Sequence, residues 1–211
     1  MKIEWYQDDP KYQEELNNNK ELWNIKVKNR YDVLEQDIVL IEKMLQIAIN
    51  DKNIAAKEIW NIMGYMCLSM FDITCLTQTI INEETKWKNI LFTKKLILIL
   101  YETQKDLPHL FGKKFRKIFD NIVNSKDYIK EMNSLLKPIS VFTSEYEEYL
   151  KIARNTVSAH RDHDTVIQIS MMKKMDPYII IRLAIELEQQ IRKLYDHIKK
   201  LAISMVQIRE V

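Results

Sequence analysis

Apolar residues recur at steps of three and four along most of the chain, which is the spacing of one face of an α-helix. The clearest case follows Asp176-Pro177, a pair that favours a helix start because aspartate caps the first turn and proline fits its first position. This heptad seam predicts a long C-terminal helix that buries one face in a bundle or against a partner. The seam consists of Ile180, Ala184, Leu187, Ile191, Leu194, Ile198, Leu201, Met205 and Ile208.

The same spacing predicts helices over most of the remaining chain. Asn82 is expected to cap the third of them, Lys137-Pro138 to end the fifth, and Ser144 to open the next with a capping box. The resulting prediction is an all-α antiparallel bundle of six to eight helices. The expected helices cover residues 31–49, 54–81, 83–107, 110–123, 126–136, 144 onward, 165–174 and 177 onward.

The predicted domain organisation is simple. Residues 1–28 are polar and are expected to form an irregular arm packed on the body by its aromatic side chains, while residues 29–211 form one domain. The chain of 211 residues has only 2 glycines and 4 prolines, too few for the many turns of a sheet. The net charge of +2 neither requires nor excludes a nucleic-acid partner.

Composition also bears on where the protein works. The longest unbroken apolar run, residues 96–101, is too short to span a bilayer, and the N-terminus has no apolar signal core. Cys67 and Cys75 are expected to be buried free thiols, since eight residues of helix would separate them by roughly 12 Å. These features predict a soluble, cytoplasmic protein that needs no membrane.

The densest group of titratable side chains is the stretch RNTVSAHRDHD, Arg154–Asp164. An arginine fork suits a phosphate and the charge that grows on its oxygens, and a histidine moves protons near neutral pH. Asn155 adds a hydrogen-bonding group. RNA supplies its own nucleophile, the 2′-hydroxyl, so this chemistry needs no metal or other cofactor.

On a straight helix Arg154 and His160 lie about 600° of rotation and about 9 Å of rise apart, so they do not share a face. Two arrangements would bring them together. Either the helix ends or kinks between them, or a second copy of the chain supplies the partner across a two-fold axis.

The string R-N-x-x-x-A-H-R-D resembles the R-polar-x(3–5)-H motif of HEPN domains, an all-α ribonuclease family found in toxin–antitoxin and abortive-infection systems. The resemblance covers residues 140–205 and implies a homodimer whose two motifs form one metal-independent RNA-cleaving site. It matches Arg154, Asn155 and His160 to the family's active residues. It also implies a role in toxin or phage-defence biology, with a cognate antitoxin or regulatory protein as a partner.

Basic residues near the motif are candidates for RNA binding. Arg161 follows the histidine directly, and Lys173 and Lys174 end the next predicted helix. A second basic set lies at 113–117 and includes Phe115; it is expected either to follow an RNA backbone or to be a solvated face whose phenylalanine enters the core.

Other interpretations remain open from the sequence. Arg154 could form a surface ion pair with Glu147, and Asp162 and Asp164 could cap the helix at 165–174. The chain could then be a non-catalytic binding or dimerisation module, such as an antitoxin, immunity or assembly protein. A metal-dependent phosphohydrolase using His160, His163, Asp164 and His109 is a further alternative.

Overall fold

The structure is a computed structural model, which describes residues 10–118, 125–155 and 165–207. These residues form a bundle of helices. Within these ranges the chain forms helices and no strand, which confirms the predicted all-α bundle. The helices are α1 (Pro10–Asn18), α2 (Lys20–Asn50), α3 (Ile54–Asn82), α4 (Lys86–Leu110), α5 (Lys113–Arg116), α6 (Ser125–Arg154), α7 (Thr165–Lys174) and α8 (Pro177–Gln207).

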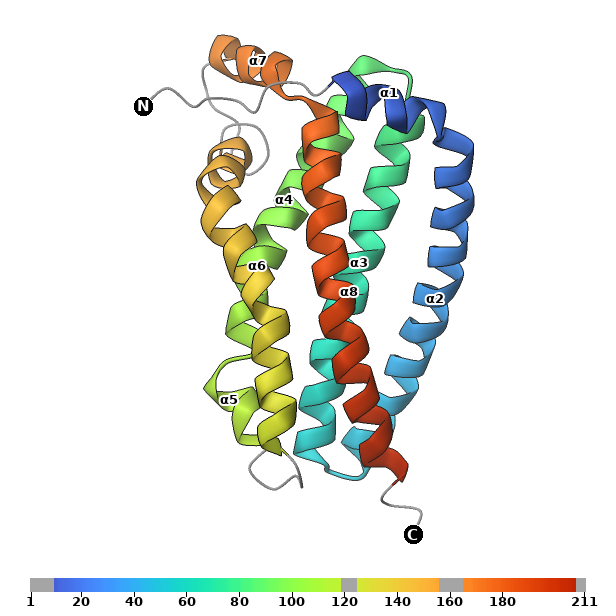
Figure 1. Cartoon of the computed structure of the whole chain (residues 1–211), viewed down its shortest axis with the longest axis vertical. Coiled ribbons are helices and arrows are strands. Elements are labelled where there is room, and N and C mark those ends of the chain that lie inside the picture. The colour runs from blue at the N-terminus through green and yellow to red at the C-terminus, as the bar shows by residue number, and fades with distance from the viewer. Residues whose placement is uncertain (1–9, 119–124, 156–164, 208–211) are drawn as a thin grey trace.

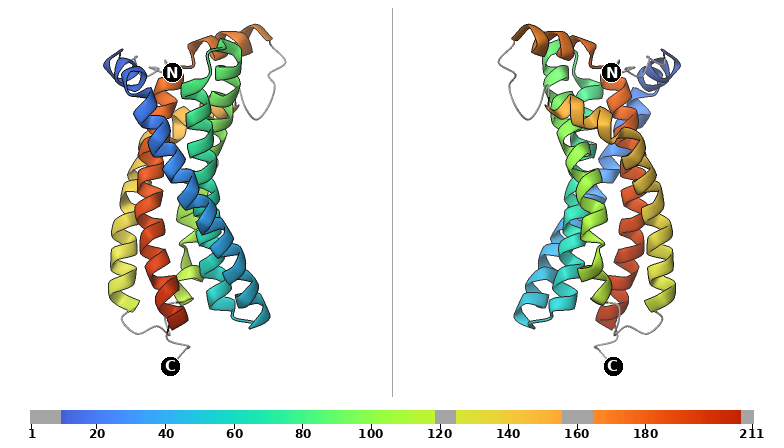
Figure 2. Two further views of the ribbon diagram at one scale, coloured as in Figure 1. Left: turned by 90° about the vertical axis from the view of Figure 1, so that its right-hand side faces the viewer. Right: turned by 90° about the vertical axis from the view of Figure 1, so that its left-hand side faces the viewer.

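The long helices α2, α3, α4, α6 and α8 alternate in direction along the chain, so that α2, α4 and α8 are parallel to one another and antiparallel to α3 and α6 (Figure 1). Helix α8 packs on α3, α4 and α6, and α3 and α6 also pack on α4. Helix α2 packs mainly on α3 and crosses obliquely over the outer side of the bundle (Figure 2). The short helix α7 lies across the end of the bundle at which α6 finishes and α8 begins (Figure 1).

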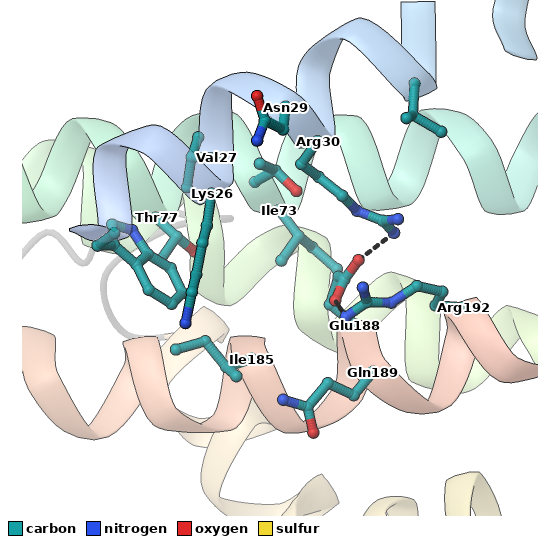
Figure 3. A pocket seen from close by; sticks show the side chains of 13 residues that line it. Lys26, Val27, Asn29, Arg30, Ile73, Thr77, Ile185, Glu188, Gln189 and Arg192 are labelled. Atoms are coloured by element: carbon teal, nitrogen blue, oxygen red, sulfur yellow. Dashed lines mark hydrogen bonds and ion pairs between the residues drawn. The ribbon is translucent and has the colours of Figure 1, made fainter. Parts of the chain in front are cut away.

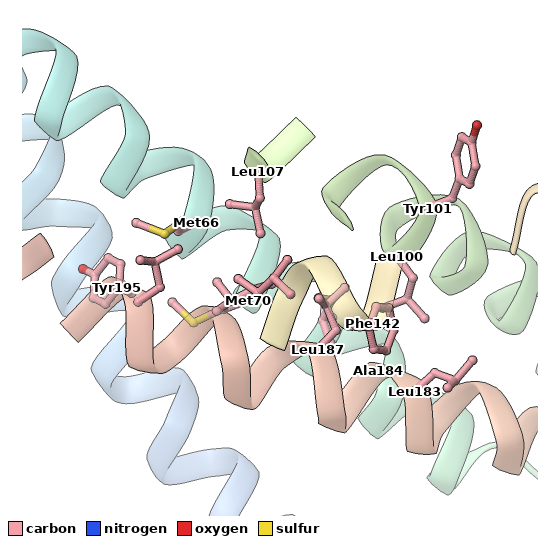
Figure 4. Packing of buried hydrophobic residues seen from close by; sticks show 14 of the residues in the cluster. Met66, Met70, Leu100, Tyr101, Leu107, Phe142, Leu183, Ala184, Leu187 and Tyr195 are labelled. Carbon is pink, nitrogen blue, oxygen red and sulfur yellow. The ribbon is translucent and has the colours of Figure 1, made fainter. Parts of the chain in front are cut away.

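The predicted heptad seam forms the centre of the core. Its members from Ile180 to Leu201 are each at most 2% exposed, and they meet apolar side chains of α3, α4 and α6 (Figure 4). Met63, Met66 and Met70 are buried beside them, as expected for flexible side chains that fill gaps in a core. The described part of the seam is therefore an intramolecular interface and is not free to bind a partner.

Local capping signals fix the starts of two core helices. The Asn53 side chain accepts a hydrogen bond of 3.0 Å from the backbone N–H of Ala56 and caps α3. The Asp176 side chain accepts one of 2.8 Å from the N–H of Tyr178, so α8 begins at Pro177 as the sequence predicts. Asn82, in contrast, is the last residue of α3 and does not cap α4, whose N-cap position is Thr85.

The prediction that Pro138 ends a helix was wrong, because α6 is continuous from Ser125 to Arg154. Proline inside a helix removes one backbone hydrogen bond and costs roughly 3 kcal/mol. The apolar face of α6 runs through the proline without interruption, and its burial outweighs that cost. Ser144 opens no new helix; its hydroxyl donates to the carbonyl of Val141 at 2.8 Å. The buried face consists of Met132, Ile139, Phe142, Tyr146, Tyr149, Leu150 and Ala153.

Two further expectations need correction. The described part of the segment 1–28 is helical, since it contains α1 and the start of α2 at Lys20. The helix expected over 110–123 is reduced among the described residues to α5, followed by a short 3-10 turn. Gly112 separates α4 from α5, and a Cβ at this position would lie 2.9 Å from the carbonyl oxygen of His109, so the turn requires glycine.

The two cysteines differ in environment, although the sequence suggested that both are buried. Cys67 is buried, and burial raises the pKa of its thiol to about 11, with the nearby Asp37 adding to the effect. Cys75 is exposed. Both are free thiols on α3.

One described helix, α3, is long and apolar enough to cross a membrane by length and composition. Half of its most apolar 18-residue window is buried inside the bundle. Core helices of soluble proteins meet the same criterion, so the finding is weak evidence for a membrane span.

Leu187→Ala is predicted to lower the free energy of unfolding by about 2–5 kcal/mol, because it leaves a cavity at a fully buried seam position. Urea denaturation followed by circular dichroism measures this loss. Leu68→Ala is the matched control, since Leu68 is 53% exposed and its truncation should change stability by about 0.5 kcal/mol or less. Equal losses in the two variants would contradict the assignment of the seam to the core.

Pro138→Ala is predicted to raise the free energy of unfolding, by roughly 1–3 kcal/mol, because alanine restores a backbone donor within a continuous helix. The side chain is exposed, so no core contact is lost. A decrease in stability on urea denaturation would show that the helix is interrupted at this position in solution.

Candidate functional site

The candidate site begins where α6 ends. Arg154 is the last residue of α6, and Asn155 follows it with an exposed side chain. The two side chains contact each other, because Nη1 of Arg154 donates a hydrogen bond of 3.1 Å to Oδ1 of Asn155. The structure therefore places the first two residues of the motif side by side at a helix end.

Helix α4 holds the arginine in place. Nη2 of Arg154 lies 3.0 Å from Oε1 of Glu102, and the guanidinium carbon lies 5.0 Å from the ring centroid of Tyr101. The Tyr101 ring is largely buried, so it offers a fixed aromatic face to the cation. A positive charge is also favoured at this end of α6, where the helix dipole is negative.

The guanidinium is only partly accessible. The side chain of Arg154 is 28% exposed, and its Nε atom is buried without a hydrogen-bond partner among the described residues. Nη1 and Nη2 are engaged by Asn155 and Glu102. An incoming phosphate would therefore share the guanidinium with Glu102 or displace that carboxylate.

The ion pair with Glu102 was not predicted from the sequence, which pointed to Glu147 as a surface partner of Arg154. Glu102 directly follows the apolar run at 96–101, and a carboxylate at the end of such a run is the only signal in the sequence for this contact. Its pairing with Arg154 depends on the packing of α4 against α6, which sequence spacing does not specify.

The rest of the motif lies outside the described residues. This applies to His160, Arg161 and His163, and to the proposed caps Asp162 and Asp164. Of the residues expected to bind RNA, Lys173 and Lys174 are described; they are exposed and lie in the last turn of α7.

The second basic set has mostly structural contacts. Phe115 is fully buried, Lys114 pairs with Glu58 at 3.1 Å, and Arg116 donates to Oδ1 of Asn133 at 2.7 Å. These contacts agree with the interpretation of a solvated face whose phenylalanine enters the core.

The ligands considered for a metal site are largely outside the described ranges. Among the described residues no group of three or more histidine, cysteine, aspartate or glutamate side chains is placed to hold a metal ion. His109 is exposed in the last turn of α4.

The contact between Arg154 and Glu102 can be measured with a double-mutant cycle. Because both side chains are partly exposed, we predict a coupling free energy of about 0.2–1 kcal/mol between Arg154→Ala and Glu102→Ala. Urea denaturation of the wild type, the two single variants and the double variant gives this value.

The exposed Lys151, three residues before Arg154 on α6, provides the control for this cycle. Its replacement by alanine should show no coupling to Glu102→Ala. A zero coupling for Arg154 itself would mean that the ion pair does not hold the guanidinium in solution.

No protein-family model matches the chain, and no curated protein and no solved structure shows significant similarity to it. The function must therefore be inferred from the residues of this chain and their geometry.

Proposed function

We propose that the protein is a metal-independent RNA endonuclease of HEPN type. The observation that carries the proposal is the motif of Arg154, Asn155 and His160 in an all-α bundle, with the first two side chains hydrogen-bonded to each other at the end of α6. The resemblance implies that this motif cleaves RNA in related domains.

Arg154 would bind the phosphate at which the RNA is cut. Its contacts with Glu102 and Tyr101 restrict the orientation of the guanidinium, which lowers the entropy lost when a phosphate binds. The planar guanidinium offers parallel donors to two phosphate oxygens and stabilises the charge that develops on them.

Asn155 would orient the phosphate or the attacking hydroxyl, and His160 would transfer protons. In the proposed reaction the 2′-oxygen attacks phosphorus, a new P–O2′ bond forms and the P–O5′ bond breaks. One proton leaves the 2′-hydroxyl and one is added to the 5′-oxygen. The products are a 2′,3′-cyclic phosphate and a 5′-hydroxyl.

A homodimer would complete this site. With two copies of the motif in one groove, one His160 accepts the proton from the 2′-hydroxyl while the second donates a proton to the leaving oxygen. Arg161, Lys173 and Lys174 would contact flanking phosphates. The biological setting that we propose is a cytoplasmic toxin or phage-defence effector restrained by a cognate antitoxin or regulatory protein.

A second candidate function is a non-catalytic binding or dimerisation module. The observation that favours it is the engagement of Arg154 by Glu102 and Asn155, with its Nε atom buried. A guanidinium held in this way stabilises the junction of α4 and α6 whether or not it meets a substrate.

Cleavage of RNA in EDTA distinguishes the two functions. The wild type is expected to cleave total RNA and a defined RNA oligonucleotide without added metal, but not a DNA oligonucleotide of the same sequence, because DNA lacks the 2′-hydroxyl. His160→Ala is expected to lower the cleavage rate by about 100- to 10,000-fold, the usual contribution of a general acid or base.

His163→Ala is the matched control, since it removes a neighbouring histidine to which the proposed reaction gives no role. Its cleavage rate should remain within a few-fold of the wild type. Equal, undetectable cleavage by wild type and His160→Ala, in protein purified free of bound inhibitor, would favour the non-catalytic module. Cleavage only with added metal, lost in His163→Ala, would favour the phosphohydrolase alternative.

A further inference from the structure

A pocket lies between α2 and α8, with α3 as its floor, on a different set of helices from Arg154 (Figure 3). Its volume is about 590 Å³, within the range of small-molecule sites. Helices α2 and α8 both pack on α3, and the α3 residues that line the pocket are buried. Apolar side chains, among them Val27, Ile73 and Ile185, form part of the lining.

The charged residues that line the pocket have an excess of positive charge. Lys26, Arg30 and Arg192 contribute three positive charges and Glu188 one negative charge, which leaves a net charge of +2. Arg30 pairs with one carboxylate oxygen of Glu188, and Arg192 pairs with the other at 3.2 Å (Figure 3). Two guanidinium groups thus converge on one carboxylate, and their remaining N–H groups exceed what Glu188 can accept.

Three polar atoms of the lining residues are buried without a hydrogen-bond partner among the described residues. They are Nε1 of Trp23, Nε of Arg30 and Oγ1 of Thr77. Thr77 is only 3% exposed, and each such group raises the free energy of the folded state unless something in the pocket bonds to it. All three can donate a hydrogen bond, and all three belong to residues that line the pocket.

The access of the two arginines differs. The side chain of Arg30 is 18% exposed and that of Arg192 is 42% exposed. The guanidinium of Arg192 is therefore the more accessible of the two to an anion that enters from solvent. Trp23 adds a planar indole surface, against which a flat ring can stack.

We propose that this pocket binds a small organic oxyanion, with a flat, hydrogen-bond-accepting body and one phosphate or carboxylate group. The anionic group would bind Arg192 and Lys26, the two cations of the lining that solvent reaches most. The flat body would lie against Trp23 and the apolar lining, with an acceptor atom toward Thr77. This site is independent of the proposed nuclease motif.

Isothermal titration calorimetry of the full chain tests the proposal with four probes. Adenosine 5′-monophosphate and indole-3-acetate each combine a flat ring with an anionic group, whereas adenosine and inorganic phosphate have only one of the two features. We expect at least one of the first pair to bind, and adenosine and inorganic phosphate to bind at least about tenfold more weakly. Tighter binding of adenosine 5′-monophosphate would indicate a phosphate-binding site, and tighter binding of indole-3-acetate would indicate a carboxylate-binding site.

Two variants of lining residues and one control variant test whether the ligand binds in this pocket. Arg192→Gln should weaken binding roughly 10- to 100-fold, while Lys193→Ala, an exposed neighbour outside the lining, should leave it unchanged. Thr77→Val should weaken binding and also raise the melting temperature of the free protein, because it removes a buried hydroxyl without a partner. A Thr77 with a purely structural role would change stability alone.

The proposal is overturned if neither adenosine 5′-monophosphate nor indole-3-acetate binds with a Kd below about 10 mM. It is also overturned if binding occurs but Arg192→Gln weakens it no more than Lys193→Ala does. Neither result bears on RNA cleavage, since the motif at the end of α6 is left intact in every variant.

Discussion

The structure depends on the burial of one face of α8. The seam from Ile180 to Leu201 is almost fully removed from water, and α3, α4 and α6 each pack on this helix. Burial of a large aliphatic side chain stabilises a fold by roughly 1.5–3 kcal/mol, so this face is a major contribution to the stability of the bundle. Helices α4 and α6 both pack on α8, whereas α2 and α8 both pack on α3. The α4–α6 pair and the α2–α8 pair each present a group of charged side chains.

Both groups place charges where the bundle is only partly closed to water. At the junction of α4 and α6, Arg154 is held by Glu102 and Tyr101. Between α2 and α8, Glu188 lies between Arg30 and Arg192. A buried carboxylate is costly unless it is paired, and two guanidinium groups more than neutralise it. The excess of donors in the second group is the reason that its pocket is suited to an anion.

The fold could be predicted from the sequence wherever one face of a helix was continuously apolar. The seam of α8 and the start signal at Asp176-Pro177 were sufficient for the last helix. The prediction failed where a single helix-breaking residue was given more weight than a continuous apolar face. Pro138 was taken as a helix end, although the buried face of α6 continues on both sides of it. In the same way, residues 20–28 were predicted to be irregular because of their polar side chains, although they form the first turns of α2.

Only the contact between neighbouring residues of the candidate site could be predicted from the sequence. Arg154 and Asn155 were chosen from the motif, and their contact follows from adjacency in sequence. Glu102 and the pocket residues were missed because their contacts join positions far apart in the chain; Arg30 and Glu188 are separated by 158 residues. No spacing rule relates such positions before the helices are packed. His160, Arg161 and His163 lie outside the described residues, so their place in the site stays a prediction.

The central claim, that the motif cleaves RNA by attack of the 2′-hydroxyl, is tested most directly by the end groups of the product. A 5′-labelled RNA oligonucleotide would be incubated with the wild type in EDTA and its fragments analysed by mass spectrometry. The account predicts fragments that end in a 2′,3′-cyclic phosphate, paired with fragments that begin with a 5′-hydroxyl, and neither in His160→Ala. Fragments with a 3′-hydroxyl and a 5′-phosphate, or no fragments at all, would contradict it.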